Sequence, residues 1–204
     1  MKKIIYITVL FLSFGMTARL QAQHISLNYQ MAAPLGETKD FTKNFSFRGV
    51  SLDYQYFLNE KFTVGIGLGW NVFHKSLADA TGNFTFGNDD EIYTITGKQF
   101  RYTNTVPLLI GGRYYFSGEN RKIRPYAGIG LGTSWTETRL EVGHFVANKD
   151  GWQFAFAPEI GAYIPICDRF GFNIGAKYNY AVKTSELPAQ QNLAINLGIT
   201  LNAR

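Results

Sequence analysis

Two runs of strongly alternating residues lie side by side near the C-terminal end of the chain. Between Gly151 and Val182, large apolar residues recur at every second position on both sides of a tight turn at residues 167–169. A period of two is the pattern of a β-strand, so the two runs predict a β-hairpin. The intervening positions carry mostly Gly, Ala, Asn and Gln, whereas a soluble sheet turns charged residues and Thr to water. We therefore interpret the apolar face as facing lipid and the small polar face as the interior of a barrel; a soluble sheet is the alternative.

Glu159 and Lys177 are the two charged residues on the polar face of this hairpin. If Ile166 pairs with Phe170 across the turn, Glu159 lies directly opposite Lys177. A lone buried charge is costly and a paired one is tolerated, so this arrangement suits an enclosed interior. We predict an interior ion pair that holds the two strands in register.

The same alternation recurs along the rest of the chain and predicts eight strands. A change of phase around Gly49 predicts a β-bulge there, and Pro107 suggests a bulge or a position near a barrel rim. Connections alternate between short turns and longer polar segments, which is typical of outer-membrane barrels. The sequence therefore predicts an all-β fold, an eight-stranded antiparallel up-and-down transmembrane β-barrel. The expected strands cover residues 24–33, 45–57, 62–73, 99–116, 123–139, 151–166, 170–182 and 190–201.

Aromatic residues gather at both ends of the predicted strands. Barrels carry girdles of aromatic side chains where they meet the lipid headgroups. We expect Trp70, Trp135 and Trp152 to form the girdle at the long-loop end, and Phe57, Phe62, Phe116 and Phe170 the girdle at the other end.

The predicted interior contains more bases than acids. An eight-stranded barrel is just wide enough for its own side chains, so we expect a filled polar interior and no general diffusion pore; a narrow channel for small solutes is the alternative. The excess of bases suggests that loop acids such as Asp79, Asp89 or Glu91 fold back over the mouth, or that water or an anion enters the lumen. Across the turn at 117–122 we expect Arg113 to face Tyr126 and Arg124 to face Tyr115. Besides the ion pair, the expected interior network comprises Arg48, Asp53, Arg101, Arg113, Arg124 and Tyr126.

The N-terminus has the features of a secretory signal peptide. Lys2 and Lys3 precede a short apolar run, and a small residue, Ala22, offers a cleavage site before Gln23. We expect residues 1–22 to be the signal peptide and 23–204 the barrel in the outer membrane; a retained anchor is the alternative. Removing three basic residues lowers the formal charge from +5 to +2, so charge gives no reason to expect nucleic-acid binding.

Several segments of the predicted strands resemble a known family. They are PLLIGGRYYF (107–116), IRPYAGIGLG (123–132), PEIGAYIP (158–165) and FGFNIGAKYNY (170–180). These segments resemble the small eight-stranded outer-membrane barrels of the OmpA and OmpX type, in the form common in Bacteroidetes. The resemblance implies a non-enzymatic protein with a structural or surface-interaction role. Its implied partners are outer-membrane lipid and, during biogenesis, the barrel-assembly machinery and periplasmic chaperones.

One short motif points to a different activity. His74 and Ser76 resemble the His-x-Ser pair of lipid A deacylase barrels, with Asp90 or Glu91 as the orienting acid of a triad. The alternative reading is an ordinary histidine at the entrance of a loop. We predict no metal, since the single Cys167 has no ligand cluster beside it, and no cofactor, since no phosphate-binding loop appears. An extracellular ligand would bind the long connections at 34–44, 74–91, 140–150 and 183–189.

Overall fold

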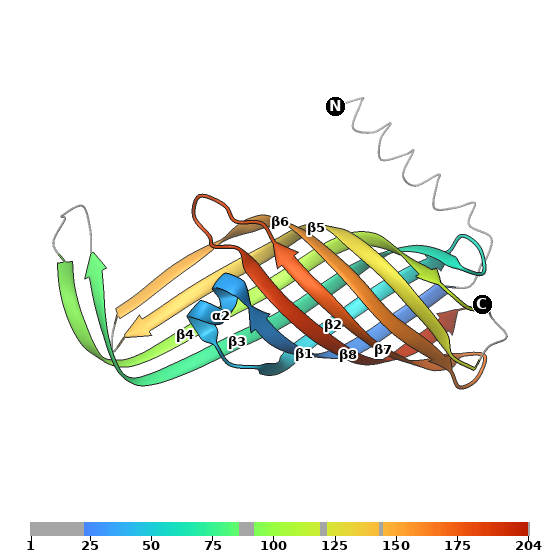
Figure 1. The fold of residues 1–204 in the computed structure, drawn as a ribbon, viewed down its shortest axis with the longest axis horizontal. Helices are drawn as coiled ribbons and strands as arrows, with labels where there is room; N and C mark the ends of the chain where they lie inside the picture. The colour runs from blue at the N-terminus through green and yellow to red at the C-terminus, as the bar shows by residue number, and fades with distance from the viewer. Residues whose placement is uncertain (1–22, 86–91, 119–121, 143–144, 204) are drawn as a thin grey trace, which may run out of the picture.

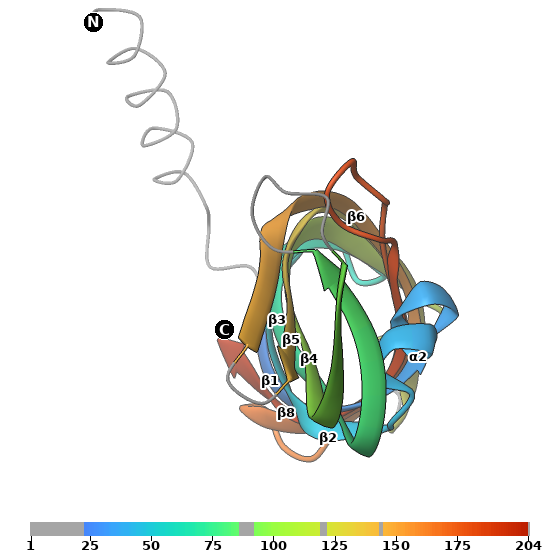
Figure 2. The ribbon, with the colours of Figure 1, turned by 90° about the vertical axis from the view of Figure 1, so that its left-hand side faces the viewer.

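Eight consecutive antiparallel strands close into a single barrel in the computed structural model, which describes residues 23–85, 92–118, 122–142 and 145–203. Each strand pairs with its neighbours in sequence, and β8 pairs with β1 along its whole length (Figures 1 and 2). The predicted fold class is thereby confirmed. The elements are β1 (Gln23–Leu35), α2 (Gly36–Thr42), β2 (Ser46–Phe57), β3 (Phe62–Thr85), β4 (Ile92–Tyr115), β5 (Arg124–Val142), β6 (Phe145–Pro165), β7 (Phe170–Ala181) and β8 (Gln190–Ala203).

The alternating pattern decides which side chains enter the barrel. Along β1, Leu27 and Tyr29 point outward and are exposed, whereas Asn28 and Gln30 between them are buried. The outward face is apolar and the inward face is polar, the reverse of a soluble protein, as expected for strands that cross lipid. None of the helical residues within the described ranges forms a segment long and apolar enough to span a membrane.

The two ends of the barrel differ in the length of their connections. At one end, short turns join β2 to β3, β4 to β5 and β6 to β7. At the other end, β3 to β6 continue well beyond the last residues that pair with β2 and β7, and they project from the barrel (Figure 1). The projection is a sheet, because β4 still pairs with β5 at Gln99↔Val142 and β5 with β6 at Val142↔Phe145.

Three segments predicted as loops contain more regular structure than expected, although the small hairpin suggested around Asn83 to Tyr93 is present, with Phe84 paired to Tyr93. Residues 34–44 include the helix α2, and most of 74–91 and 140–150 belongs to strands. Outside lipid a strand needs no apolar face, so these residues lack the alternation on which the prediction depended. Asp89, Asp90 and Glu91 lie outside the described residues, as do the side chain of Asp79 and the predicted signal peptide.

A bulge in β2 turns one predicted interior residue outward. The pairs Gln30↔Gly49 and Ala32↔Ser46 leave a single residue, Met31, opposite both Phe47 and Arg48. The bulge therefore lies one residue before the position predicted at Gly49. Both residues of the bulge are exposed, and Phe47 is 62% accessible. The prediction that Arg48 joins the interior network is wrong, because the extra residue shifts the alternation at this point.

Pro107 lies in the middle of β4 and faces the interior. It is buried and pairs with Ser134 of β5, without a register shift on that side. On the other side, the ladder to β3 is interrupted between Leu68↔Leu108 and Asn71↔Thr105. The suggested bulge or rim position is therefore wrong: the strand accommodates a residue without an N–H by giving up pairing to β3 over a short stretch.

Candidate functional site: the barrel interior and its outer mouth

Four charged side chains meet in the centre of the barrel. Glu159 and Lys177 lie opposite each other in the β6–β7 register, with 3.2 Å between Lys177 Nζ and Glu159 Oε2. Lys177 Nζ also lies 3.3 Å from Asp53 Oδ1 of β2. Arg113 of β4 pairs with Glu159 and approaches Asp53 at 3.5 Å. The ion pair expected from the hairpin is thus half of a four-membered cluster that joins β2, β4, β6 and β7 across the lumen.

This cluster carries no net charge. Two acids balance two bases, and Asn28 of β1 donates a further hydrogen bond of 2.8 Å to Asp53 Oδ2. The sequence predicted more bases than acids in the interior. The cluster shows no such excess, because three of the five predicted interior bases lie elsewhere. Arg48 points outward, while Arg101 and Arg124 lie near opposite ends of the barrel. The centre therefore needs neither a loop acid nor a bound anion for neutrality.

An aromatic layer fills the barrel at the short-turn end. Phe57, Tyr115, Tyr126 and Tyr163 are all buried and in contact. The Arg124 guanidinium lies over the Tyr115 ring at 4.6 Å and donates a 2.7 Å hydrogen bond to the carbonyl of Glu60 in the β2–β3 turn. Cation–π contact and hydrogen bonding thus stabilise this buried charge.

Phe57 was predicted in the outer girdle, and its place in this layer overturns that prediction. It follows Asp53 and Gln55 in strict alternation, so the pattern itself directs it inward. The other aromatic residues predicted at this end, Phe62, Phe116 and Phe170, point outward and are exposed. At the far end, Trp70 and Trp152 are exposed on the outer surface, and Trp135 pairs with Trp152.

The register of β4 with β5 differs by two residues from the expected one. Arg113 pairs with Gly128, and Tyr115 pairs with Tyr126, so neither expected pair is a register pair. The inward direction of all these side chains is nevertheless as expected. Arg113 still lies over the Tyr126 ring at 4.8 Å, since a long side chain reaches across two positions. Tyr126 donates a hydrogen bond of 3.0 Å to Asn173 Oδ1.

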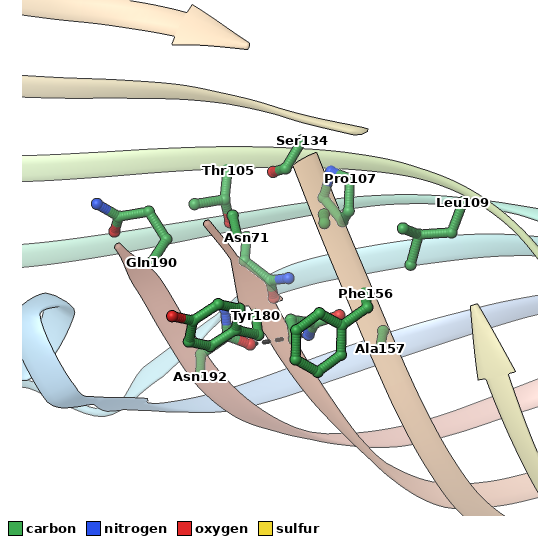
Figure 3. Close-up of a pocket in the computed structure, with 13 residues that line it drawn as sticks. Asn71, Thr105, Pro107, Leu109, Ser134, Phe156, Ala157, Tyr180, Gln190 and Asn192 are labelled. Atoms are coloured by element: carbon green, nitrogen blue, oxygen red, sulfur yellow. Dashed lines mark hydrogen bonds between the residues drawn. The ribbon is translucent and has the colours of Figure 1, made fainter. Parts of the chain in front are cut away.

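The half of the lumen between the charge cluster and the outer mouth is nearly full. A cavity of about 20 Å³ lies there among polar and apolar side chains of several strands (Figure 3). That volume holds about one water molecule. Two buried oxygens of residues that line this cavity, Asn71 Oδ1 and Thr105 Oγ1, have no hydrogen-bond partner among the described residues, and a water there could donate to them.

The outer mouth is covered by α2 and by the β7–β8 connection. The hydroxyl of Thr38 on α2 accepts a 2.8 Å hydrogen bond from the backbone N–H of Gln191, and Thr38 is buried. Arg101, predicted inside, lies at the mouth and donates a hydrogen bond of 3.4 Å to the carbonyl of Phe41. Leu187 of the β7–β8 connection is 2% exposed. The sequence pattern did not reveal this apolar plug, because a single Leu in a polar connection carries no periodic signal.

The histidine and serine of the deacylase-like motif lie on the outer surface of β3. The imidazole of His74 packs against Tyr102 at 4.9 Å, and Ser76 is exposed. Within the described part of the chain, neither side chain forms a hydrogen bond or ion pair, and Asp90 and Glu91 fall outside it. The described residues also contain no group of three potential metal ligands.

A family model for the outer membrane protein beta-barrel domain matches residues 7–200. The chain belongs to this family. It is therefore an outer-membrane β-barrel protein, of the small eight-stranded kind that the sequence pattern indicates. No curated protein sequence matches this chain significantly.

Solved structures share the fold at low sequence identity. The attachment invasion locus protein Ail of Yersinia pestis is 12% identical at a TM-score of 0.54, covering 90% of this chain and 99% of that one. A major outer membrane protein from Thermus thermophilus is 11% identical with a TM-score of 0.53, and the match covers 89% of this chain and 99% of that one. The outer membrane protease OmpT from Escherichia coli is 8% identical with a TM-score of 0.51, and the match covers 89% of this chain and 96% of that one. These likenesses show the fold alone.

Proposed function

We propose that this family member is a non-catalytic surface-interaction protein, which presents the projecting sheet of β3 to β6 to a ligand outside the cell. The projection itself supports this role. β3 pairs with β2 no further than Asn71, yet it continues to Thr85, and β6 begins at Phe145 but pairs with β7 only from Ala155. A barrel that served only to fill the membrane would not need these extensions.

The projecting sheet has two open edges, β3 and β6. Residues 146–150 of β6 are exposed at every position, on both faces of the strand. Unpaired backbone groups on such an edge can pair with an extended segment of another molecule. One neighbour of the same fold, Ail, has been crystallised with the heparin analogue sucrose octasulfate, at 15% identity and a TM-score of 0.52. That complex supports an extracellular ligand as the kind of partner to seek.

The filled lumen argues against transport as the main role. The aromatic layer, the charge cluster and the covered mouth follow one another along the barrel, and the small interior cavities of about 10–20 Å³ each have room for about one water. We expect no stable conductance in planar lipid bilayers. A large, steady single-channel current from the purified protein would contradict a filled lumen.

Deleting the outer part of the projection tests the proposed role. A variant that lacks residues 76–100 and joins the shortened β3 and β4 through a Gly-Gly turn should still insert and shift on a gel after heating. Whole cells carrying this variant should lose adhesion to an extracellular matrix or host-cell surface that binds cells with the intact protein. Adhesion that is unchanged by this deletion and by a matched deletion of residues 139–148 would refute the proposal.

We further propose that residues 1–22 are removed during export. Mass spectrometry of the protein isolated from outer-membrane fractions should then show an N-terminus at Gln23. A mature protein that retains Met1 would contradict this boundary.

A further inference from the structure

A shallow apolar groove lies on the outer, lipid-facing surface between β2, β3 and β4. Its volume is about 330 Å³, and its walls include Val50 and Leu52 of β2, Leu68 and Trp70 of β3, and Val106 of β4. It coincides with the stretch where the ladder between β3 and β4 is interrupted beside Pro107. Because this surface faces lipid, an acyl chain fills such a groove in the membrane. The residues around the groove decide which lipid provides that chain.

Arg48 stands directly above this groove. It lies two residues beyond Val50 on the same strand, toward the projecting end, and the β2 bulge turns it outward. Bulges commonly re-aim a side chain, here at the cost of a regular ladder. The exposed rings of Phe45 and Phe47, which precede Arg48 in β2 and the segment before it, pack against each other at a centroid separation of 4.9 Å. An exposed arginine next to exposed aromatic residues at this level suits the lipid headgroup region.

Three more cations lie near the mouth of the barrel, where Lys75 and Arg101 occupy inward-facing positions, in phase with the buried Phe73 and Thr103. Asn44 donates a 3.2 Å hydrogen bond to the carbonyl of His74, which brings the end of α2 against β3. Lys75 follows His74 and is the register partner of Arg101. Partial desolvation and the positive charges of Lys43 and Arg101 together lower the pKa of Lys75.

These cations have little negative charge around them. Within the described residues, none of Lys43, Arg48, Lys75 and Arg101 forms an ion pair, although Asp40 lies three residues before Lys43 on α2. By contrast, the exposed Arg139 on β5 is paired with Glu141 at 2.7 Å. Arg48, an exposed cation on the outer surface above an apolar groove, matches a ligand with an anionic head and an apolar tail.

We propose that this groove and Arg48 form a binding site for a phosphate-bearing lipid of the outer leaflet. One acyl chain occupies the groove beside Trp70, and the phosphate contacts Arg48. Arginine suits this contact because its planar guanidinium can donate two parallel hydrogen bonds to phosphate oxygens. This site is separate from the projecting sheet, so it can be tested without reference to the surface-interaction role.

Trp70 lines the groove and can report which lipid fills it. A protein with Trp135→Phe and Trp152→Phe keeps Trp70 as its sole tryptophan and would be refolded into phosphatidylcholine vesicles. The vesicles would contain a fraction of bromine-labelled phosphatidic acid or bromine-labelled phosphatidylcholine, which quench tryptophan on contact. We expect stronger quenching of Trp70 by the labelled phosphatidic acid, and an association constant at least about fivefold above that of phosphatidylcholine.

Two controls separate a site from general attraction. Arg48→Gln should lower the preference about fivefold, whereas Arg139→Gln, which removes an exposed cation on another strand, should leave it unchanged. A protein that keeps Trp152 as its sole tryptophan should show no comparable preference. A heat-dependent gel shift would establish that each variant is folded.

The proposal is overturned by any of three results: equal quenching by both lipids, an equal preference at Trp152, or an unchanged preference in Arg48→Gln. Soluble anions provide the remaining test. If inorganic phosphate or heparin, at matched ionic strength, abolishes the preference at Trp70, the cations serve a soluble ligand and the lipid site is refuted.

Discussion

Replacing Glu159 by Gln removes one negative charge from the centre of the barrel with almost no change in side-chain size. Arg113 and Lys177 would then share Asp53 as their one acidic partner. The side chains involved are no more than 10% exposed, so solvent cannot compensate for the lost charge. Breaking a buried ion pair from one side costs about 3–5 kcal/mol. Because Gln can still accept a hydrogen bond from Arg113, we expect a loss of about 3 kcal/mol in the free energy of unfolding, the lower end of that range.

Urea titration of the refolded protein in lipid vesicles, followed by tryptophan fluorescence, measures this loss. Glu141→Gln is the matched control, because it breaks the exposed pair with Arg139 and should cost at most about 1 kcal/mol. Adding Lys177→Met to Glu159→Gln leaves one acid facing one base and should recover part of the stability. If Glu159→Gln unfolds at the wild-type urea concentration, or if Glu141→Gln is equally destabilised, the cluster does not hold the barrel together.

Two further substitutions test the packing of the interior. Phe57→Ala should cost about 3–5 kcal/mol in the same titration because Phe57 is buried in the aromatic layer, whereas Phe62→Ala on the outer surface should cost clearly less; equal losses would place Phe57 outside after all. Gly161→Ala should cost about 1–3 kcal/mol, because the added methyl group would come within 2.6 Å of the Tyr126 hydroxyl. Gly118→Ala, whose nearest neighbour would be 3.8 Å away, should be neutral, and a harmless Gly161→Ala would refute the close contact.

The sequence was sufficient to predict the barrel, the strand number and the face of nearly every strand residue. These depend on a period of two that lipid enforces on the outward positions. Phe57 was placed on the wrong face. The alternation directs this residue inward, but the prediction followed the expectation of an aromatic girdle instead. Arg48 illustrates the opposite limit, since the alternation gives no warning of where a bulge adds its extra residue.

Interior contacts between distant strands were harder to predict than strand faces. Glu159 and Lys177 could be matched because a tight turn fixes the register of their hairpin. Asp53 and Arg113 come from β2 and β4, and their approach depends on how the barrel closes, which no local pattern records. Beyond the membrane the alternation itself ends, so the projecting sheet and α2 were read as loops.

The close contact of Tyr126 with Gly161 has a consequence for how the chain assembles. The two residues pair directly across β5 and β6. If the register of β6 with β5 shifted by one residue, apolar side chains would enter the lumen and polar ones would face lipid, which is energetically unfavourable. A slide by two residues keeps every face correct, so lipid cannot detect it. It would, however, place Glu159 or Tyr163 opposite Tyr126, where no space remains. Gly161 thus leaves room for the Tyr126 ring in one register of β5 and β6 only. It therefore disfavours a two-residue shift, which the alternation of apolar and polar residues cannot prevent.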